Sequence, residues 1–286
     1  MTNIVNIGST AIGGDNKLAI IAGPCVIESL DVTLRAAEAL KDITDELGIG
    51  FVFKSSFDKA NRSSVSSYRG PGFEGGLKIL ERVKKEVGVP VISDIHETSQ
   101  IKGSSGVLDA LQIPAFLSRQ TDLLVAAADS GLPVNVKKGQ FMAPDDMALV
   151  VGKMAKRKNF KGLCLCERGT TFGYHNLVVD TRSLVIMRKL GWPVVFDATH
   201  SVQLPSAGQG KSGGDRHFIP YLARAAVAVG VDAIFMETHP EPDKALCDGP
   251  NQWPLSQAKA LMRSLRDLSQ QARDITNKFL EESNDA

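Results

Sequence analysis

Eight short runs of apolar residues, rich in β-branched side chains, recur along the chain. They lie at residues 18–24, 50–54, 89–93, 107–113, 132–137, 162–166, 193–198 and 231–237. Several runs are nearly continuous in apolar residues and lack the alternation that is typical of a half-exposed strand. Such runs predict strands of a parallel sheet that are covered on both faces.

Helix-length amphipathic segments separate these runs. In residues 31–47, apolar side chains recur at three- and four-residue spacing, and Gly48 follows as a stop signal. Residues 74–87 repeat the pattern and end before Gly88. Further helices are predicted at 121–130, 144–157, 180–190, 216–229 and 255–280, whereas 97–106 is short and weak as a helix.

The alternation of strands and helices predicts an α/β fold, and eight such units over about 250 residues indicate a (β/α)8 TIM barrel. A doubly wound sheet is the alternative, but it usually has about six strands. The glycine-rich stretches at 70–76 and 206–214 also lack the spacing of a dinucleotide fingerprint. We interpret residues 1–286 as one domain, with residues 1–16 as a short N-terminal cap and Gly13–Asn16 as its β-hairpin turn.

Composition narrows the functional classes. The 286 residues are 43% hydrophobic and 23% charged, and 33 basic against 32 acidic residues leave a net charge of +1. This balance argues against a nucleic-acid partner. No apolar stretch approaches the roughly 20 residues that span a bilayer, and the N-terminus lacks the pattern of a secretory signal. The four cysteines suit free thiols in a reducing cytoplasm, and we interpret Cys164 and Cys166 as small buried hydrophobes.

Polar side chains gather where the predicted strands end, which is the edge at which barrels of this kind carry their active sites. One such group is usually structural, but here each of the eight strand ends carries at least one. They are Cys25 and Glu28, then Lys54, Asp58, Lys59, Asn61 and Arg62, then Asp94 and His96, Gln112, Asn135, Lys137 and Lys138, Glu167 and Arg168, Asp197 and His200, and finally Glu237, His239 and Asp248. Their coincidence predicts an active site at the barrel mouth.

Two groups stand out among these residues. The first is cationic and contains Lys54, Lys59, Arg62, Lys137 and Arg168. Salt bridges to nearby carboxylates account for some of these charges, but the excess predicts small substrates that carry both phosphate and carboxylate. The second group is Cys25, His200, Glu237 and Asp248, whose strands are neighbours in a closed barrel. A thiolate, an imidazole and two carboxylates suit a divalent transition metal, and zinc, iron, manganese and cobalt all remain open.

At these residues the chain resembles the 3-deoxy-D-manno-octulosonate 8-phosphate synthases over essentially its whole length. The resemblance is carried by AGPCVIES at 22–29, FKSSFDKANRSS at 53–64, YRGPG at 68–72, SDIHE at 93–97, QIPAFLSRQTDLL at 112–124, NVKKGQF at 135–141, ERGTTFGYHNLVVD at 167–180, FDATHSVQLP at 196–205 and METHPEP at 236–242. It implies the (β/α)8 barrel. It also implies a transferase that joins phosphoenolpyruvate, D-arabinose 5-phosphate and water into the eight-carbon product and phosphate, a step of Kdo and lipopolysaccharide biosynthesis.

The family has a metal-dependent branch with cysteine in the first-strand motif and a metal-independent branch with asparagine there. Gly23-Pro24-Cys25 matches the metal-dependent branch, and the resemblance implies Cys25, His200, Glu237 and Asp248 as ligands. The stretch at 247–250, CDGP, is more typical of metal-independent members. A metal site that is only partly required therefore stays open.

The resemblance also implies roles for single residues. Lys54, Lys137 and Arg168 hold phosphoenolpyruvate, with Lys59 and Gln112 nearby, and Asn61 contacts the sugar. Arg62 and Ser63 grip the sugar 5-phosphate, in this family from a neighbouring subunit, which implies a homotetramer. The catalytic set expected from these matches is Lys54, Lys59, Asn61, Asp94, His200 and Asp248, in which His200 or Asp248 assists proton transfer.

Three other functions are alternatives. The related synthase that uses erythrose 4-phosphate carries a Lys-Pro-Arg-Thr type motif where this chain has Lys59-Ala60-Asn61-Arg62-Ser63, which favours the five-carbon sugar. A Schiff-base aldolase using Lys54 or Lys137 predicts an adduct that borohydride traps. A phosphosugar sensor predicts binding without phosphate release. The glycine-rich segment 206–214 is interpreted either as a mobile lid over the sugar or as an ordinary flexible loop.

Overall fold

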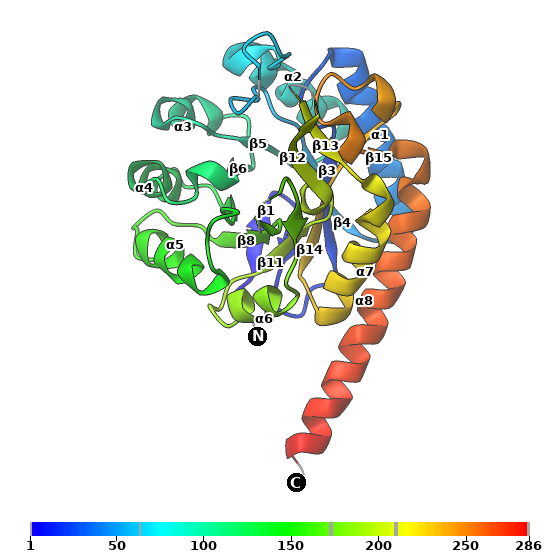
Figure 1. The fold of residues 1–286 in the computed structure, drawn as a ribbon. Coiled ribbons are helices and arrows are strands. Elements are labelled where there is room, and N and C mark those ends of the chain that lie inside the picture. The colour runs from blue at the N-terminus through cyan, green and yellow to red at the C-terminus, as the bar shows by residue number, and fades with distance from the viewer. Residues whose placement is uncertain (1, 63, 172–173, 209–210, 285–286) are drawn as a thin grey trace.

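The computed structural model describes residues 2–62, 64–171, 174–208 and 211–284, and it describes their side chains except at 171, 206–208, 211–212 and 276–284. Eight parallel strands close into a barrel (Figure 1), each beside the next in the chain. The strands are β3 (Ala19–Gly23), β4 (Gly50–Lys54), β5 (Val91–Asp94), β6 (Ala110–Ile113), β7 (Val134–Lys137), β8 (Leu163–Glu167), β11 (Val194–Asp197) and β14 (Ala233–His239). Because β14 pairs with both β11 and β3, the sheet has no free edge, and the predicted (β/α)8 barrel is confirmed.

Helices surround the barrel in the order expected from the sequence. They are α1 (Leu30–Leu47), α2 (Gly72–Val87), α3 (Thr98–Ser104), α4 (Thr121–Asp129), α5 (Met147–Met154), α6 (Arg182–Arg188), α7 (Ile219–Val229) and α8 (Leu255–Asn284). Helices α5 and α7 begin later than predicted, because residues 144–146 and 216–218 form 3-10 turns before them. The end of α8 extends beyond the barrel (Figure 1).

Local signals fix where α1 begins and ends. The Ser29 side chain accepts a hydrogen bond from the Val32 amide, which satisfies a free donor of the first turn. At the other end Gly48 adopts a left-handed conformation with φ 62°, as the stop signal predicted.

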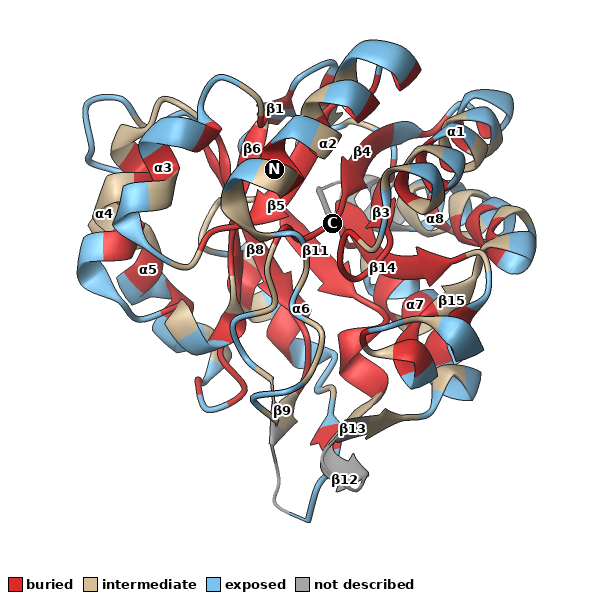
Figure 2. Cartoon of the chain, turned by 90° about the horizontal axis from the view of Figure 1, so that it is seen from above, coloured by how far each residue is buried: buried red, intermediate tan, exposed pale blue. Residues whose placement is uncertain are grey.

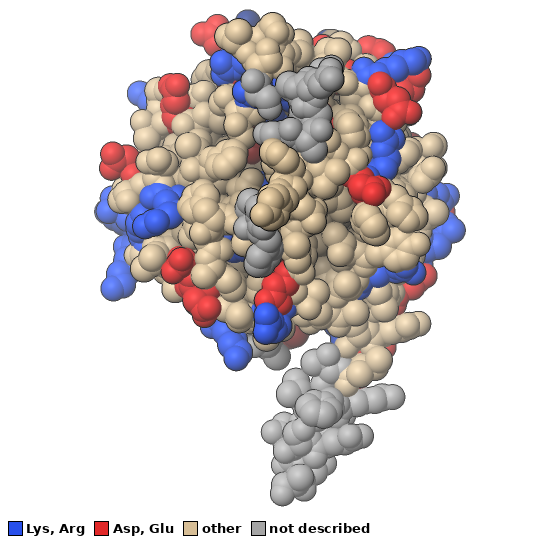
Figure 3. Space-filling view, in the orientation of Figure 1, with Lys and Arg blue, Asp and Glu red and all other residues tan. Residues whose placement is uncertain are grey.

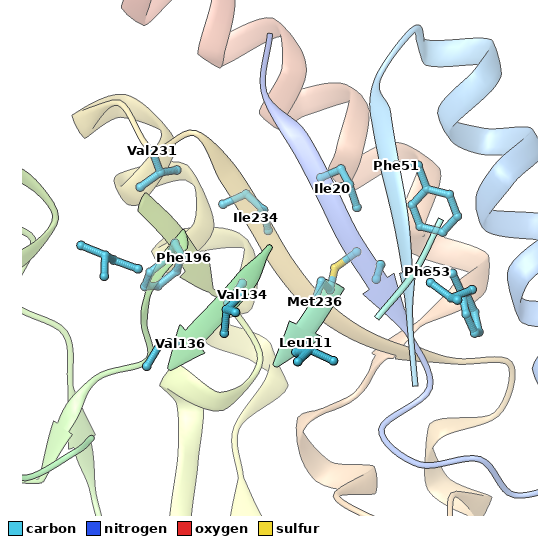
Figure 4. Close-up of a cluster of buried hydrophobic side chains, with 14 of the residues drawn as sticks. Ile20, Phe51, Phe53, Leu111, Val134, Val136, Phe196, Val231, Ile234 and Met236 are labelled. Carbon is cyan, nitrogen blue, oxygen red and sulfur yellow. The ribbon is translucent and has the colours of Figure 1, made fainter. Parts of the chain in front are cut away.

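Most of the core lies between the strands and the helices. Figure 4 shows side chains of this layer, among them Ile20, Phe53, Phe196 and Met236. Their neighbours along the strands point into the barrel, where Cys164 and Cys166 are fully buried and pack with other apolar side chains. The interpretation of these two cysteines as buried hydrophobes is confirmed. Figure 2 shows the same division, with buried strands inside exposed helix faces.

The N-terminal hairpin closes one end of the barrel, but its turn is not where the sequence predicted it. Strands β1 (Val5–Ile7) and β2 (Thr10–Ile12) pair with Ile7 opposite Thr10, so the turn lies at residues 8–9. The prediction of a hairpin turn at Gly13–Asn16 was wrong. A turn does form there, with the Asn16 amide bonded to the Gly13 carbonyl at 3.2 Å, but it leads from the hairpin into β3.

Short elements surround the opposite end of the barrel. They are β9 (Thr170–Thr171), β10 (Leu177–Val178), β12 (Gln203–Gly208), β13 (Lys211–Gly214) and β15 (Trp253–Pro254). Figure 2 shows β12 and β13 far from β1. The segment 206–214 thus belongs to a two-stranded hairpin, whose tip at 209–210 lies outside the described residues, and its role as a lid stays a prediction. No described helix combines the length and apolarity that crossing a membrane requires.

Candidate active site

The polar strand ends meet at the barrel mouth, opposite the N-terminal hairpin. They line an open cavity of about 2080 Å³, whose walls include Lys59, Asp94, Lys137, Arg168 and Asp248. On this face of the molecule, acidic and basic residues are interspersed around the rim (Figure 3). The predicted active site is therefore a concave, charged cavity.

A buried ion-pair network lies at the base of the mouth. The ammonium of Lys54, at the end of β4, is 2.9 Å from Glu237 Oε1 on β14 and 3.7 Å from Asp94 Oδ2 on β5. The side chains of Lys54 and Glu237 are fully buried. Burial alone would raise the pKa of Glu237, but Lys54 and Lys59 hold it well below its usual value. Glu237 is thus a carboxylate inside the protein.

Asp94 links this network to the next strands. Its carboxylate accepts hydrogen bonds from the Ser56 hydroxyl and, at 2.7 Å, from Gln112 Nε2. The other end of the Gln112 amide accepts a bond from Asn135 Nδ2 at 2.9 Å. Burial disfavours the charged form of Asp94, yet nearby lysines hold its pKa below the usual value. Both ends of the Gln112 amide are thus engaged by protein groups beneath the cavity, and its place near phosphoenolpyruvate stays a prediction.

A second ion-pair cluster joins strands β7 and β11. Lys137 Nζ is 2.5 Å from Asp197 Oδ2, and the same oxygen is 2.7 Å from His200 Nδ1. Burial opposes the charge of Asp197, but His200 and Lys137 lower its pKa. Because Asp197 holds Nδ1, the His200 ring presents Nε2 toward Glu237 Oε2, at 3.6 Å.

Arg168 follows β8 and has one guanidinium nitrogen without a hydrogen-bond partner among the described residues. Its Nη2 donates to Gln203 Oε1 at 3.0 Å, while its Nη1 is buried without a hydrogen-bond partner among the described residues. Burial lowers the pKa of Arg168, although an arginine keeps its charge at neutral pH. An unpaired guanidinium nitrogen lining a cavity is suited to bind an anion.

The four predicted metal ligands come together in two overlapping groups that share Asp248. In one group the ligand atoms of His200, Glu237 and Asp248 all lie within 4.8 Å of one another. In the other, Cys25 and Asp248 lie within the same limit of a third residue, Cys247. Cys25 Sγ is 3.6 Å from Asp248 Oδ2. The predicted ligands are thus adjacent, although they come from three strand ends and a loop.

The donor set fits a divalent metal. Glu237 Oε2 is buried and has no hydrogen-bond partner among the described residues, and it faces His200. An unsatisfied buried carboxylate oxygen is costly unless a cation completes it. Burial, and to a lesser extent the neighbouring Cys247, raises the pKa of the Cys25 thiol. A thiolate at Cys25 therefore needs a positively charged partner. A transition metal bound beside Asp248, which both groups of ligand atoms share, would supply positive charge here.

The segment after β4 brings the remaining predicted residues to the mouth. Lys59 Nζ is 3.4 Å from Glu237 Oε1, and Asn61 is exposed on the cavity wall. Arg62 Nη1 lies 2.8 Å from Cys247 Sγ and 3.7 Å from Asp248 Oδ1 of its own chain. Ser63, predicted to bind the sugar phosphate, lies outside the described residues.

Three residues of the site were missed by the sequence reasoning. Gln203 binds Arg168, and Cys247 and Gln252 stand beside Cys25. Gln203 and Gln252 carry no charge, and although Gln203 lies in the stretch FDATHSVQLP, neither stands directly after a strand of the barrel. Cys247 did have a signal, because it directly precedes the predicted ligand Asp248, but it was interpreted only as part of a loop sequence.

The comparisons with known proteins agree with this architecture. The sequence profile of the DAHP synthetase I family matches residues 2–274. A protein of Geobacter sulfurreducens named 2-dehydro-3-deoxyphosphooctonate aldolase is 58% identical over 266 residues, which cover 93% of this chain and 97% of that protein. Proteins with the same name from Syntrophotalea carbinolica and Legionella pneumophila (strain Corby) are 57% and 59% identical, over 93% and 89% of this chain and 95% and 92% of their own lengths. The chain therefore belongs to the DAHP synthetase I family, in which its relatives include the 2-dehydro-3-deoxyphosphooctonate aldolases.

Proposed function

We propose that the protein condenses phosphoenolpyruvate with D-arabinose 5-phosphate and water, giving 3-deoxy-D-manno-octulosonate 8-phosphate and inorganic phosphate. The observation that carries this proposal is identity of 57–59%, over nearly the whole chain, to proteins named for that product's aldolase. The buried cations of the mouth support it, because both substrates are multiply anionic.

The first task of the site is to hold two anions together. Lys54, Lys137 and Arg168 take the phosphate and carboxylate of phosphoenolpyruvate, and Arg168 Nη1 is the donor already free to do so. Asn61 and Arg62 line the cavity wall. Asn61 contacts the sugar, and Arg62 with Ser63 grips the sugar 5-phosphate. Fixing both reactants converts a bimolecular encounter into a positioned one, which contributes about 7–11 kcal/mol in well-oriented systems.

The second task is to stabilise charge and move protons. When C3 of phosphoenolpyruvate attacks the aldehyde, C2 gains positive character, and the carboxylates of Glu237 and Asp94 stabilise it. His200, oriented by Asp197 at 2.7 Å, holds its Nε2 at the mouth as a proton donor or acceptor. Asp248, in the loop between β14 and β15, assists this proton transfer. Breakdown of the phosphohemiketal then releases phosphate.

We further propose that Cys25, His200, Glu237 and Asp248 hold a divalent transition metal, drawn from zinc, iron, manganese and cobalt. When bound, such an ion supplies Lewis-acid polarisation of the aldehyde and orients the attacking water. The resemblance of residues 247–250 to a stretch typical of metal-independent members supports a metal requirement that is partial rather than absolute.

The proposal extends to assembly and location. A homotetramer in the cytoplasm, with Arg62 and Ser63 serving a neighbouring site, accords with the resemblance and with the free thiols. Within the single chain Arg62 reaches its own Asp248. Mixing an Arg62→Ala variant with a variant that lacks Lys54 tests the arrangement, since shared sites restore activity in mixed oligomers and separate sites do not.

The deciding experiment measures phosphate release from phosphoenolpyruvate with arabinose 5-phosphate, before and after chelation and after adding back single metals. Erythrose 4-phosphate serves as the matched alternative substrate. Turnover with arabinose 5-phosphate that is lost on chelation and restored by one metal is the expected result. Turnover with arabinose 5-phosphate that chelation does not change supports the proposed reaction and contradicts a metal requirement. Turnover only with erythrose 4-phosphate overturns the substrate assignment.

A further inference from the structure

We infer that Phe235 is a positioning residue for phosphoenolpyruvate, because its buried ring holds the ammonium groups of Lys137 and Lys54 from beneath the mouth. The inference rests on the proposed function, in which both lysines bind that substrate. It adds an uncharged residue that lies within a strand rather than at its end.

Phe235 reaches the site from below because side chains alternate along β14. On this strand Ile234 and Met236 face the surrounding helices (Figure 4), whereas Phe235 belongs to the apolar cluster inside the barrel. Since residues two apart on a strand point to the same side, Phe235 lies one layer below Glu237. The Phe235 side chain is fully buried. The ring therefore forms part of the floor under the charged mouth.

Two lysines of the mouth place their ammonium groups over that ring. Lys137 Nζ lies 3.7 Å from the ring centroid of Phe235, and Lys54 Nζ lies 5.5 Å from it. Both distances are within the roughly 6 Å at which an aromatic face attracts a cation. The imidazole of His200 packs against the same ring, with the two centroids 5.9 Å apart. Side chains from the ends of β4, β7 and β11 thus meet on one phenylalanine.

An aromatic ring can hold Lys137 without reducing its charge. Asp197 Oδ2 already accepts a hydrogen bond from the Lys137 ammonium at 2.5 Å. A second carboxylate below Lys137 would cancel the positive charge that a substrate anion needs. The face of an aromatic ring attracts the ammonium through its quadrupole and carries no net charge. The ring therefore stabilises the buried ammonium and leaves its charge available to phosphoenolpyruvate.

Filling the barrel interior is the alternative role of Phe235. Its neighbours in that cluster are aliphatic side chains and two cysteines, as is usual for a residue that only packs. The two roles depend on different properties of the ring. Packing depends on its size and shape, whereas attraction of a cation depends on the electron density of its face. Fluorine withdraws electron density from the ring face and changes the shape of the ring little, so fluorination separates the two roles.

The direct test replaces Phe235, in the full chain, with phenylalanines that carry one, two and three ring fluorines. Calorimetry then measures the dissociation constant of phosphoenolpyruvate. This constant should rise with each fluorine, to about tenfold for the trifluoro ring, because a desolvated cation–π contact accounts for a factor of this order. The same series at Phe196 is the matched control and should leave binding unchanged, since Phe196 is equally buried on the neighbouring strand but faces the helices. A dissociation constant that stays constant across the Phe235 series overturns the inference.

A pair of conventional variants checks the same point. Phe235→Leu and Phe196→Leu remove the same atoms from fully buried positions, so both should lose folding stability. Phe235→Leu alone should weaken phosphoenolpyruvate binding, by about tenfold. Equal dissociation constants in the two variants overturn the inference.

Because binding is measured without turnover, the inference and the proposed function can fail separately. Binding that weakens with the number of fluorines, in a protein that releases no phosphate with arabinose 5-phosphate, supports the role of Phe235 and contradicts the proposed reaction. Normal phosphate release with constant binding across the Phe235 series supports the reaction and contradicts the role of Phe235. A protein that does not bind phosphoenolpyruvate contradicts both.

Discussion

Replacing Lys54 by methionine should destabilise the fold as well as abolish turnover. Lys54 and Glu237 are fully buried, and their charged atoms are 2.9 Å apart. Methionine keeps much of the side-chain length but removes the ammonium. Glu237 would then remain as a buried carboxylate with fewer cations around it.

The expected size of the effect follows from those contacts. Removing one partner of a buried ion pair typically costs about 3–5 kcal/mol of folding free energy. Lys59 remains 3.4 Å from the same Glu237 oxygen, which places the expected loss near the lower limit, about 3 kcal/mol. Since Lys54 lowers the pKa of Glu237, that pKa rises in the variant. The stability difference should therefore shrink as the pH falls and Glu237 takes up a proton.

Urea unfolding followed by circular dichroism measures this loss, with chelator in every sample so that metal binding contributes nothing. The double variant Lys54→Met with Glu237→Gln should recover about half of the loss or more, because the uncompensated charge is gone. Lys85→Met is the matched control, since its partner Glu81 is exposed and the pair contributes about 0.5 kcal/mol or less. A loss below about 1 kcal/mol in Lys54→Met refutes the reasoning.

Three further predictions concern acid stability, metal affinity and substrate binding. The pKa of Asp197 is lowered in the folded state, so its carboxylate stabilises the fold above about pH 4 and loses that effect as the pH falls. In Asp197→Asn the urea midpoint of unfolding should therefore decline less steeply below about pH 5. A decline as steep as that of the unmodified protein argues against this role. Gln252→Ala should weaken zinc binding about 10–100-fold in a chelator competition, because the hydrogen bonds that hold the Cys25 and Cys247 segments together are lost. Equal zinc affinity in this variant and in the exposed control Gln257→Ala contradicts this role of Gln252. Arg168→Lys should raise the KM for phosphoenolpyruvate about tenfold, because lysine lacks the unpaired Nη1 donor of the guanidinium. Arg182→Lys, on the surface, is the control and should leave this KM unchanged. Equal KM values in the two variants contradict the role of Arg168.

The fold followed from the sequence because a closed parallel barrel repeats one simple pattern. Each strand is covered on both faces, so its apolar run is continuous, and each helix shows one apolar stripe. What failed was local. The hairpin turn was placed at Gly13–Asn16 on the strength of its glycines, whereas the pairing of Ile7 with Thr10 puts it at residues 8–9. The buried side chains of β1 and β2 decide that register, and they face a barrel interior that the sequence does not reveal.

The site shows the same division between repeated pattern and tertiary contact. Charged groups at strand ends could be found, because the barrel places every strand end at one mouth. The ligand atoms of His200, Glu237 and Asp248 lie together there, and Cys25 lies beside Asp248 in a second group. The partner of Cys25 could not be found in this way. Cys247 is 222 residues away and does not directly follow a barrel strand, and Gln252 bonds to both segments and so helps to hold the two cysteines together. An uncharged amide buried between two loops has no periodicity and no motif, yet it joins the segments that carry Cys25 and Cys247. Which side chains stand beside Cys25 is therefore a property of the tertiary structure that strand-by-strand reasoning cannot supply.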